Sequence, residues 1–262
     1  MVLPLGDIEK TRIVPIATYF LIAINIAIYV VEVDRGQSFQ VAYAATPAEI
    51  THNEDIDRPF IYHVEPDSVE GLAPIRDRDF EIEQGPFPFP DRMWLSIFTA
   101  MFLHASPLHL AGNMLFLWIF GDNVEEVLGT TLYLVVYLAC GAAGTLVQIA
   151  VAPDALIPIL GASGAIAGVM GAYVVWFPHN RVRVLVFNFL TVMPAFLVIG
   201  LWIALQVVQG YGSIGRLGEV GGVAYLAHIG GAVAGLLIAL AFRNRAIAVQ
   251  AEAYRGRWPG AG

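Results

Sequence analysis

One serine and one histidine stand in apolar stretches of the chain where they could act together. Ser163 begins an apolar run inside a cluster of small residues, and His228 lies in another apolar run further along. A serine hydroxyl is a weak nucleophile that needs a base within hydrogen-bonding reach. Ionisable residues within runs of membrane-spanning length are rare and usually functional. The pair predicts nucleophilic catalysis, with Ser163 as the nucleophile and His228 as the general base.

Glycines recur beside both residues at helical spacing. They repeat every three or four positions, at 164, 168 and 171 after the serine and at 231 and 235 after the histidine. Two helices with such glycine faces can approach closely enough for their side chains to share a proton. Small residues are also ordinary packing residues in membranes, so the glycine spacing alone would fit a purely structural role.

His109 and Asn113 are one helical turn apart and therefore share a helix face. Acyl transfer by serine requires hydrogen-bond donors directed at the developing oxyanion. An imidazole N–H and an amide N–H are suitable, and the backbone N–H of Ser163 at a helix start is a third donor. The alternative is a structural hydrogen-bonded pair between helices. His104, shortly before them, is interpreted mainly as an anchor of the neighbouring loop.

Other kinds of site receive little support. The apolar runs that hold Ser163 and His228 contain no acidic residue, so we expect a dyad whose imidazole is oriented by packing. Cys140 has no charged neighbour in sequence, and the chain offers no zinc-type Cys/His spacing. We therefore expect no metal and no cofactor. The sequence also has no basic patch, which excludes nucleic acid as a partner.

Composition indicates a membrane protein. Of 262 residues, 57% are hydrophobic and 14% charged, with a mean hydropathy of +0.67. A soluble domain usually carries about a quarter charged residues. Only helices or closed barrels cross hydrocarbon, and these apolar runs are too long for barrel strands. The expected fold class is an all-α polytopic membrane protein with a six-helix bundle, at 13–33, 106–126, 131–151, 163–177, 185–209 and 223–242.

The remaining segments are polar. We expect 1–12 to be a cytoplasmic N-terminus, 34–92 a polar, acidic external loop between helices 1 and 2, and 243–262 a cytoplasmic tail. Helices 2 to 6 form the core at 93–242, with a glycine-rich linker at 210–222. Arginines outside the acidic loop concentrate in segments of one side, which places both termini inside. The polar residues of the inward-running helices then share one depth near the outer surface.

Two connections bear on the site. The turn 121–129 closes the second helix, and we expect its carboxylates to favour the start of the next helix through the helix dipole. The segment 156–161 contains Pro158 and leads into Ser163 as irregular backbone. Such backbone at membrane depth is tolerated only where it is buried in protein or lines a wet cavity. A hydrolase in lipid needs such a cavity to supply water.

Three motifs taken together resemble those of the rhomboid intramembrane serine proteases. In chain order they are His104 with His109 and Asn113, then Gly161-x-Ser163-Gly164, then Ala227-His228-x-Gly230-Gly231. The resemblance implies Ser163 and His228 as catalytic residues and His109, Asn113 and the Ser163 backbone as the oxyanion hole. It implies supporting roles for His104, Gly161, Gly164 and Gly231.

The same resemblance implies substrates that are transmembrane helices of other proteins, cleaved within the lipid bilayer near their outer ends. It also implies a bacterial plasma membrane location, with the fifth helix and the 210–222 linker as gate and cap. Ala167 stands where some family members carry a tyrosine that stacks on the histidine. Two alternatives remain, namely a catalytically silent rhomboid-like protein that binds membrane clients and a transporter with a midplane polar site.

Overall fold

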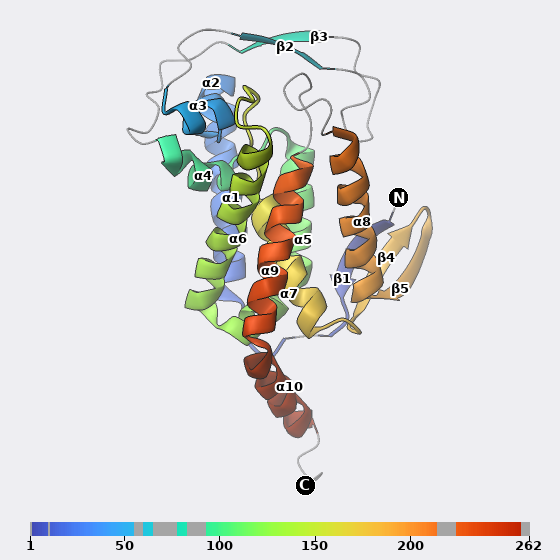
Figure 1. The fold of residues 1–262 in the computed structure, drawn as a ribbon. Helices are drawn as coiled ribbons and strands as arrows, with labels where there is room; N and C mark the ends of the chain where they lie inside the picture. The colour runs from blue at the N-terminus through green and yellow to red at the C-terminus, as the bar shows by residue number, and fades with distance from the viewer. Residues whose placement is uncertain are drawn as a thin grey trace.

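The molecule is a bundle of long helices with small sheets at its periphery (Figure 1). The computed structural model describes residues 2–9, 11–54, 60–64, 78–82, 93–213 and 224–257. The long helices of the bundle are α1 Ile16–Arg35, α5 Pro107–Leu128, α6 Thr130–Val151, α7 Ser163–Trp176, α8 Ala195–Ser213 and α9 Tyr225–Ala241. Successive helices run in alternating directions, so their connections lie at the two ends of the bundle.

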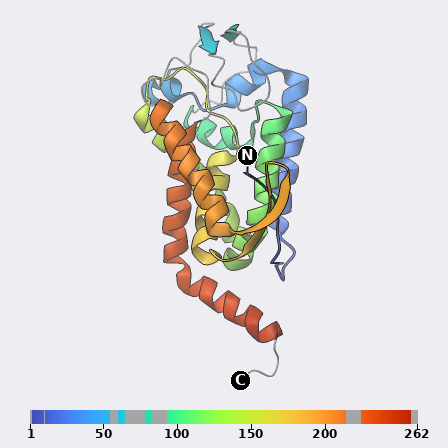
Figure 2. The same ribbon diagram turned by 90° about the vertical axis from the view of Figure 1, so that its right-hand side faces the viewer.

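The short helix α7 lies at the centre of the bundle (Figures 1 and 2). All its residues from Gly164 to Tyr173 are buried, and it contacts α5, α6, α8 and α9. A helix that is apolar on every side is stable only when other elements surround it. The residue at its start, Ser163, is thereby placed inside the protein rather than at its surface.

The expected single helix over 185–209 is wrong in its first part. Residues there form the hairpin of β4 Arg181–Val186 and β5 Phe189–Pro194, and α8 begins only at Ala195. The reason lies in a two-residue period, because exposed arginines at 181 and 183 alternate with buried valines at 182 and 184. β-Branched residues at that period favour a half-buried strand.

The all-α expectation is also wrong, because the protein is mostly helical with two small sheets. β1 Val2–Asp7 pairs antiparallel with β4, giving a three-stranded sheet in the order β1-β4-β5. A second sheet pairs β2 Phe60–Val64 with β3 Arg78–Ile82. The polar segment 1–12 therefore contains a strand whose partner lies far along the chain. No local pattern in the sequence reveals such a pairing.

Shorter helices lie in the connections between the long helices and after the last of them. They are α2 Gln37–Tyr43, α3 Pro47–His52, η2 Met93–Leu95, α4 Ser96–Thr99, η3 Ala100–Phe102 and, beyond the bundle, α10 Arg243–Arg257. Ala45, between α2 and α3, forms an isolated bridge with Ile159. This bridge joins the segment after α1 to the irregular connection before α7. Most of the acidic stretch 55–92, and the linker from 214 to 223, lie outside the described residues.

Among the described residues, α1 and α6 are each long and apolar enough to cross a membrane on their own. The number rises to four if two bent pairs each count as one span. One pair joins 93–102 to α5 across an 80° bend, and the other joins α9 to α10 across a 68° bend. Helices α7 and α8 are apolar but shorter.

Glu125 ties the end of α5 to the start of α1. Its fully buried carboxylate accepts hydrogen bonds from the backbone N–H groups of Ala17 and Thr18, both at 2.9 Å, and from the Thr18 hydroxyl at 2.8 Å. It also accepts from the Thr130 hydroxyl at the start of α6. The expectation that the turn carboxylates serve mainly the following helix is thus corrected. The first turn of α1 leaves N–H groups without helical partners, and this carboxylate binds them.

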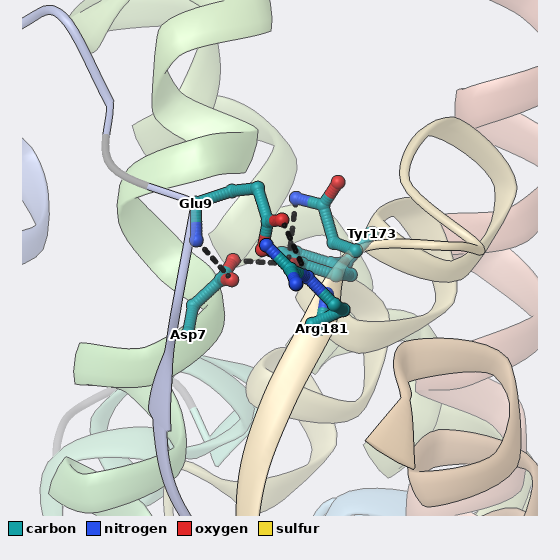
Figure 3. A network of polar contacts seen from close by, with 5 residues as sticks. Asp7, Glu9, Tyr173 and Arg181 are labelled. Carbon is teal, nitrogen blue, oxygen red and sulfur yellow. Dashed lines mark hydrogen bonds and ion pairs between the residues drawn. The ribbon is translucent and has the colours of Figure 1, made fainter. Parts of the chain in front are cut away.

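The C-terminal end of α7 is tied to β1 by polar side chains (Figure 3). The Tyr173 hydroxyl donates to the carboxylate of Asp7, which also accepts from the side-chain amide of Asn123 on α5. Two residues further on, Glu9 forms an ion pair with Arg181, which begins β4. One end of the central helix is therefore fixed to the strand, the hairpin and a neighbouring helix.

Candidate active site

Ser163 and His228 meet in the interior of the bundle. Ser163 is the first residue of α7, and His228 lies in the first turn of α9, only 7% exposed. The distance between Ser163 Oγ and His228 Nε2 is 2.6 Å, which is a hydrogen bond. The two side chains that the sequence analysis paired are thus in contact, although 65 positions separate them along the chain.

A glutamine that the sequence analysis did not select contacts the other ring nitrogen. The distance between His228 Nδ1 and Gln206 Oε1 is 2.6 Å, and Gln206 is buried on α8 at 6% exposure. The expectation that packing alone orients the imidazole is therefore wrong. The sequence did not single out Gln206, because an amide in a largely apolar helix indicates no role until the face that it occupies is known.

An aromatic ring also lies against His228, and it comes from α8. The centroid of Trp202 is 5.5 Å from that of the imidazole, with 37° between the ring planes. Position 167 on α7 is a buried alanine. The same helix thus supplies both the hydrogen bond and the ring that contact the histidine.

Helices α7 and α9 touch through their backbones. A β-carbon on Gly231 would stand 2.0 Å from the carbonyl oxygen of Gly164, and one on Gly235 would stand 1.8 Å from that of Gly168. Real β-carbons do not approach an oxygen so closely, so only glycine fits at positions 231 and 235. This close approach brings the start of α7 within reach of the histidine on α9.

Gly161 lies between Ser163 and His109. Its φ of +121° is a conformation that side chains rarely adopt, and a β-carbon there would lie 2.8 Å from Cε1 of His109 and 3.7 Å from Ser163 Oγ. The His109 imidazole and the Ser163 hydroxyl therefore flank the same glycine. The start of α5 that carries His109 is capped by Ser106, whose hydroxyl accepts from the His109 backbone N–H.

His104 is fully buried and holds Asn113. The side-chain amide of Asn113 donates to His104 Nε2 over 3.0 Å. The His104 backbone N–H donates to both carboxylate oxygens of Glu32 at 3.1 Å, and its carbonyl accepts from Gln40. The His104 ring also lies edge-on to that of His109, with centroids 5.1 Å apart. His104 thus links the loop before α5 to both residues that were predicted as oxyanion donors.

The assembled site has the parts that acyl transfer requires. A hydroxyl is hydrogen-bonded to an imidazole, an amide oxygen lies within hydrogen-bonding distance of the other ring nitrogen, and the His109 ring lies beside the same glycine as the hydroxyl. Within the part of the chain that the structure describes, no three His, Cys, Asp or Glu side chains form a group that could hold a metal ion.

Comparison with known proteins identifies the family of this chain. Residues 91–245, more than half of the chain, match the model of the Rhomboid domain. The chain is 33% identical over 147 residues to Rhomboid protein 1, mitochondrial, of Saccharomyces cerevisiae, which covers 55% of this chain and 40% of that protein. It is 34% identical over 140 residues to Rhomboid protease GluP of Bacillus subtilis, covering 52% of this chain and 26% of the relative.

Rhomboid-like protein 11, chloroplastic, of Arabidopsis thaliana is 30% identical over 156 residues, which cover 55% of this chain and 51% of the relative. The matched region thus spans between about a quarter and about half of the length of these relatives. The chain is a multi-pass membrane protein, and with its domain match and the helical bundle around Ser163 it belongs to the rhomboid family.

Proposed function

We propose that this protein is an intramembrane serine endopeptidase that hydrolyses a peptide bond in or near a transmembrane helix of other membrane proteins. The observation that carries the proposal is the 2.6 Å hydrogen bond between Ser163 Oγ and His228 Nε2. A serine within hydrogen-bonding reach of an imidazole is the arrangement that activates the hydroxyl. Membership of a family with relatives named as rhomboid proteases adds support.

In the proposed reaction, Ser163 Oγ attacks the carbonyl carbon of the scissile peptide while His228 Nε2 takes the hydroxyl proton. The tetrahedral intermediate then collapses, and the imidazolium gives that proton to the leaving amine nitrogen. The product is an ester between Ser163 and the substrate's carbonyl. Water attacks this ester, His228 takes a proton from the water and returns it to Ser163 Oγ, and a carboxylic acid leaves.

The oxyanion of each tetrahedral intermediate would accept hydrogen bonds from His109, from Asn113 and from the backbone N–H of Ser163. Ser163 begins α7, so its N–H has no partner within the helix. The amide of Asn113 carries two hydrogens, of which His104 accepts one. Preorganised donors of this kind contribute about 3–4 kcal/mol each to acyl transfer.

For the membrane arrangement we propose six spans formed by α1, α5, α6, α7, α8 and α9. Pairing of β1 with β4 supports this count, because the start of the chain and the connection after α7 must then lie on one side of the membrane. Four crossings lie between them in this assignment. The arginines 12, 181, 183, 243 and 245 gather on that side, which we take as cytoplasmic for both termini.

In this topology Ser163 lies below the outer surface. Helix α7 has 14 residues, about 21 Å of helix, against a hydrocarbon thickness of about 30 Å. The site would then face substrates whose helices end at a similar depth in a bacterial plasma membrane. Helix α8 carries side chains next to His228 and exposes apolar residues on its other face. This arrangement favours entry of the substrate helix from the lipid on the side of α8.

The proposal is tested by cleavage of a single-pass reporter protein reconstituted with the purified protein in liposomes. We expect Ser163→Ala and His228→Ala each to abolish cleavage, and His179→Ala, a histidine outside the site, to leave it unchanged. A fluorophosphonate probe should label Ser163 in the wild type and fail to label the His228→Ala variant. Undiminished cleavage by folded Ser163→Ala would refute the proposal. Biological output that persists in that variant would favour client binding.

A further inference from the structure

Gln206 of α8 determines which nitrogen of the neutral His228 ring carries the proton. An amide oxygen can only accept a hydrogen bond, so the 2.6 Å contact from Oε1 to His228 Nδ1 requires the proton to be on Nδ1. Nε2 of the neutral ring then carries the lone pair. That is the nitrogen 2.6 Å from Ser163 Oγ, so it can accept the hydroxyl proton.

Few other groups near His228 could form a hydrogen bond with Nδ1. Among the described residues, the titratable groups that face His228 are His109 from α5, Ser163 from α7 and Tyr225 on its own helix. Helix α8 presents two uncharged residues, Gln206 and Trp202. Neither histidine, serine nor tyrosine is bonded to Nδ1, so Gln206 is the partner of that nitrogen among the described residues.

We propose that Gln206 is the positioning residue of this site, and that it makes proton transfer by His228 depend on the docking of α8 against α9. This proposal rests on the proposed function. The Gln206 hydrogen bond to Nδ1 and the contact with the Trp202 ring both come from α8. A displacement of α8 from the bundle removes them together and leaves the ring free to take the other tautomer.

The opposite face of α8 has no comparable attachment in the bundle. Leu201, Leu205 and Val208 are 43%, 50% and 69% exposed, while Gln206 between them is 6% exposed. On the inward face, Trp202 also lies against Phe116 of α5, with ring centroids 6.3 Å apart. Trp202 thus packs against both α5 and the imidazole, on the same side of α8 as Gln206.

The test compares three variants of the full chain in liposomes with the single-pass reporter. Gln206→Met keeps the length of the side chain and removes the acceptor, Gln206→Glu keeps an acceptor, and Leu205→Ala alters the lipid-facing neighbour as a control. We expect Gln206→Met to lower kcat about 10-fold to 100-fold, a part of the 10²–10⁴ that a general base contributes. KM should change less than about twofold, because Gln206 is not expected to contact substrate.

Rescue and pH dependence separate positioning from a merely structural role. Gln206→Glu should retain kcat within about fivefold and move the acid limb of the kcat/KM profile to higher pH, since a carboxylate favours the imidazolium. Leu205→Ala should match the wild type. Equal kcat in Gln206→Met and the wild type, or an equally large loss in Gln206→Glu without a shifted limb, would overturn the proposal.

Two outcomes are kept distinct. If wild-type protein does not cleave, or folded Ser163→Ala cleaves as well as wild type, the proposed function fails. If wild type cleaves and the Gln206 variants behave as the control does, only the positioning role fails. Should Gln206→Met not purify as a folded protein, the acid limb of Gln206→Glu decides alone, and an unmoved limb rejects the role.

Discussion

Gly231 of α9 lies so close to Gly164 of α7 that a β-carbon on Gly231 would stand 2.0 Å from the Gly164 carbonyl oxygen. The two helices that carry the proposed dyad are therefore in backbone contact one turn beyond His228. The distance between Ser163 and His228 depends on this contact. Any side chain at position 231 must push the helices apart or prevent their packing.

We predict that Gly231→Ala lowers the free energy of unfolding by about 1–3 kcal/mol and reduces reporter cleavage. Gly200→Ala on α8 is the matched control, since a β-carbon there meets nothing within 4 Å and removal of a helical glycine stabilises by about 0.5–1 kcal/mol. Unfolding of the detergent-solubilised variants measures both effects. Equal stability of the two variants would contradict the close packing.

Gly161→Ala should damage the site more than the fold. The alanine must adopt a φ of +121° and would place its β-carbon 2.8 Å from the His109 ring, so we expect cleavage to fall about 10-fold or more. Gly36→Ala is the control, with a φ of +80° and no atom within 4 Å of the added carbon. It carries backbone strain of about 1–2 kcal/mol without a contact to the site. Equal cleavage rates in the two variants would argue against a role for His109 beside Ser163.

Glu125→Ala is expected to destabilise the bundle by about 2–5 kcal/mol. The change leaves the N–H groups of Ala17 and Thr18 without the buried carboxylate that accepts from them. Its neighbour provides the comparison, because Glu126 forms a more exposed ion pair with Arg12 and Glu126→Ala should cost less than about 1 kcal/mol. Denaturant unfolding of both variants tests the difference. Similar losses would mean that Glu125 does not secure α1.

The Asp7 carboxyl lies outside the membrane-spanning helices and makes the stability of the fold depend on pH. Burial raises the pKa of Asp7 above its ordinary value, against the hydrogen bond from Tyr173, which lowers the pKa. The folded protein therefore binds this proton more tightly than the unfolded chain does. Its contribution to stability is fully present below the ordinary carboxyl pKa of about 4 and is lost as pH rises through the folded pKa.

Asp7→Asn removes that titration, so the stability of wild type relative to Asp7→Asn should fall as pH rises from about 4. Thermal unfolding across a pH series measures it. A difference that stays constant, or that grows with pH, would show that folding does not raise the pKa of Asp7.

Local patterns were enough to predict most of what surrounds Ser163. The glycine spacing placed Gly231 and His228 on one helix face, and apolar runs located α1, α6, α7 and α9 within a few residues. Each of these features belongs to a single helix, and the spacing of residues within one helix predicts which of them share a face. Irregular backbone before Ser163 was likewise readable from Pro158 and the short following run.

What escaped prediction depends on partners distant in sequence. The residues of β4 and β5 from 185 onward were predicted as part of an apolar helix, because β1, the partner of β4, is far away in the chain. Gln206 gave no signal, since an amide in an apolar helix has meaning only once α9 lies beside it. Glu125 was assigned to the adjacent helix when its partners are on α1. In each case tertiary pairing decided the role of the residue.

The sheet that joins β1 to β4 also constrains how the chain is made. Val2 pairs with Val186, so β1 has no β4 partner until the helices between them in sequence have been synthesised. Three long helices and α7 are synthesised in that interval. Pairings between such remote segments form slowly, because a large loop must close first. Closure of this sheet therefore follows the synthesis of α7, and the Tyr173 contact to Asp7 can fix the C-terminal end of α7 only from that point on.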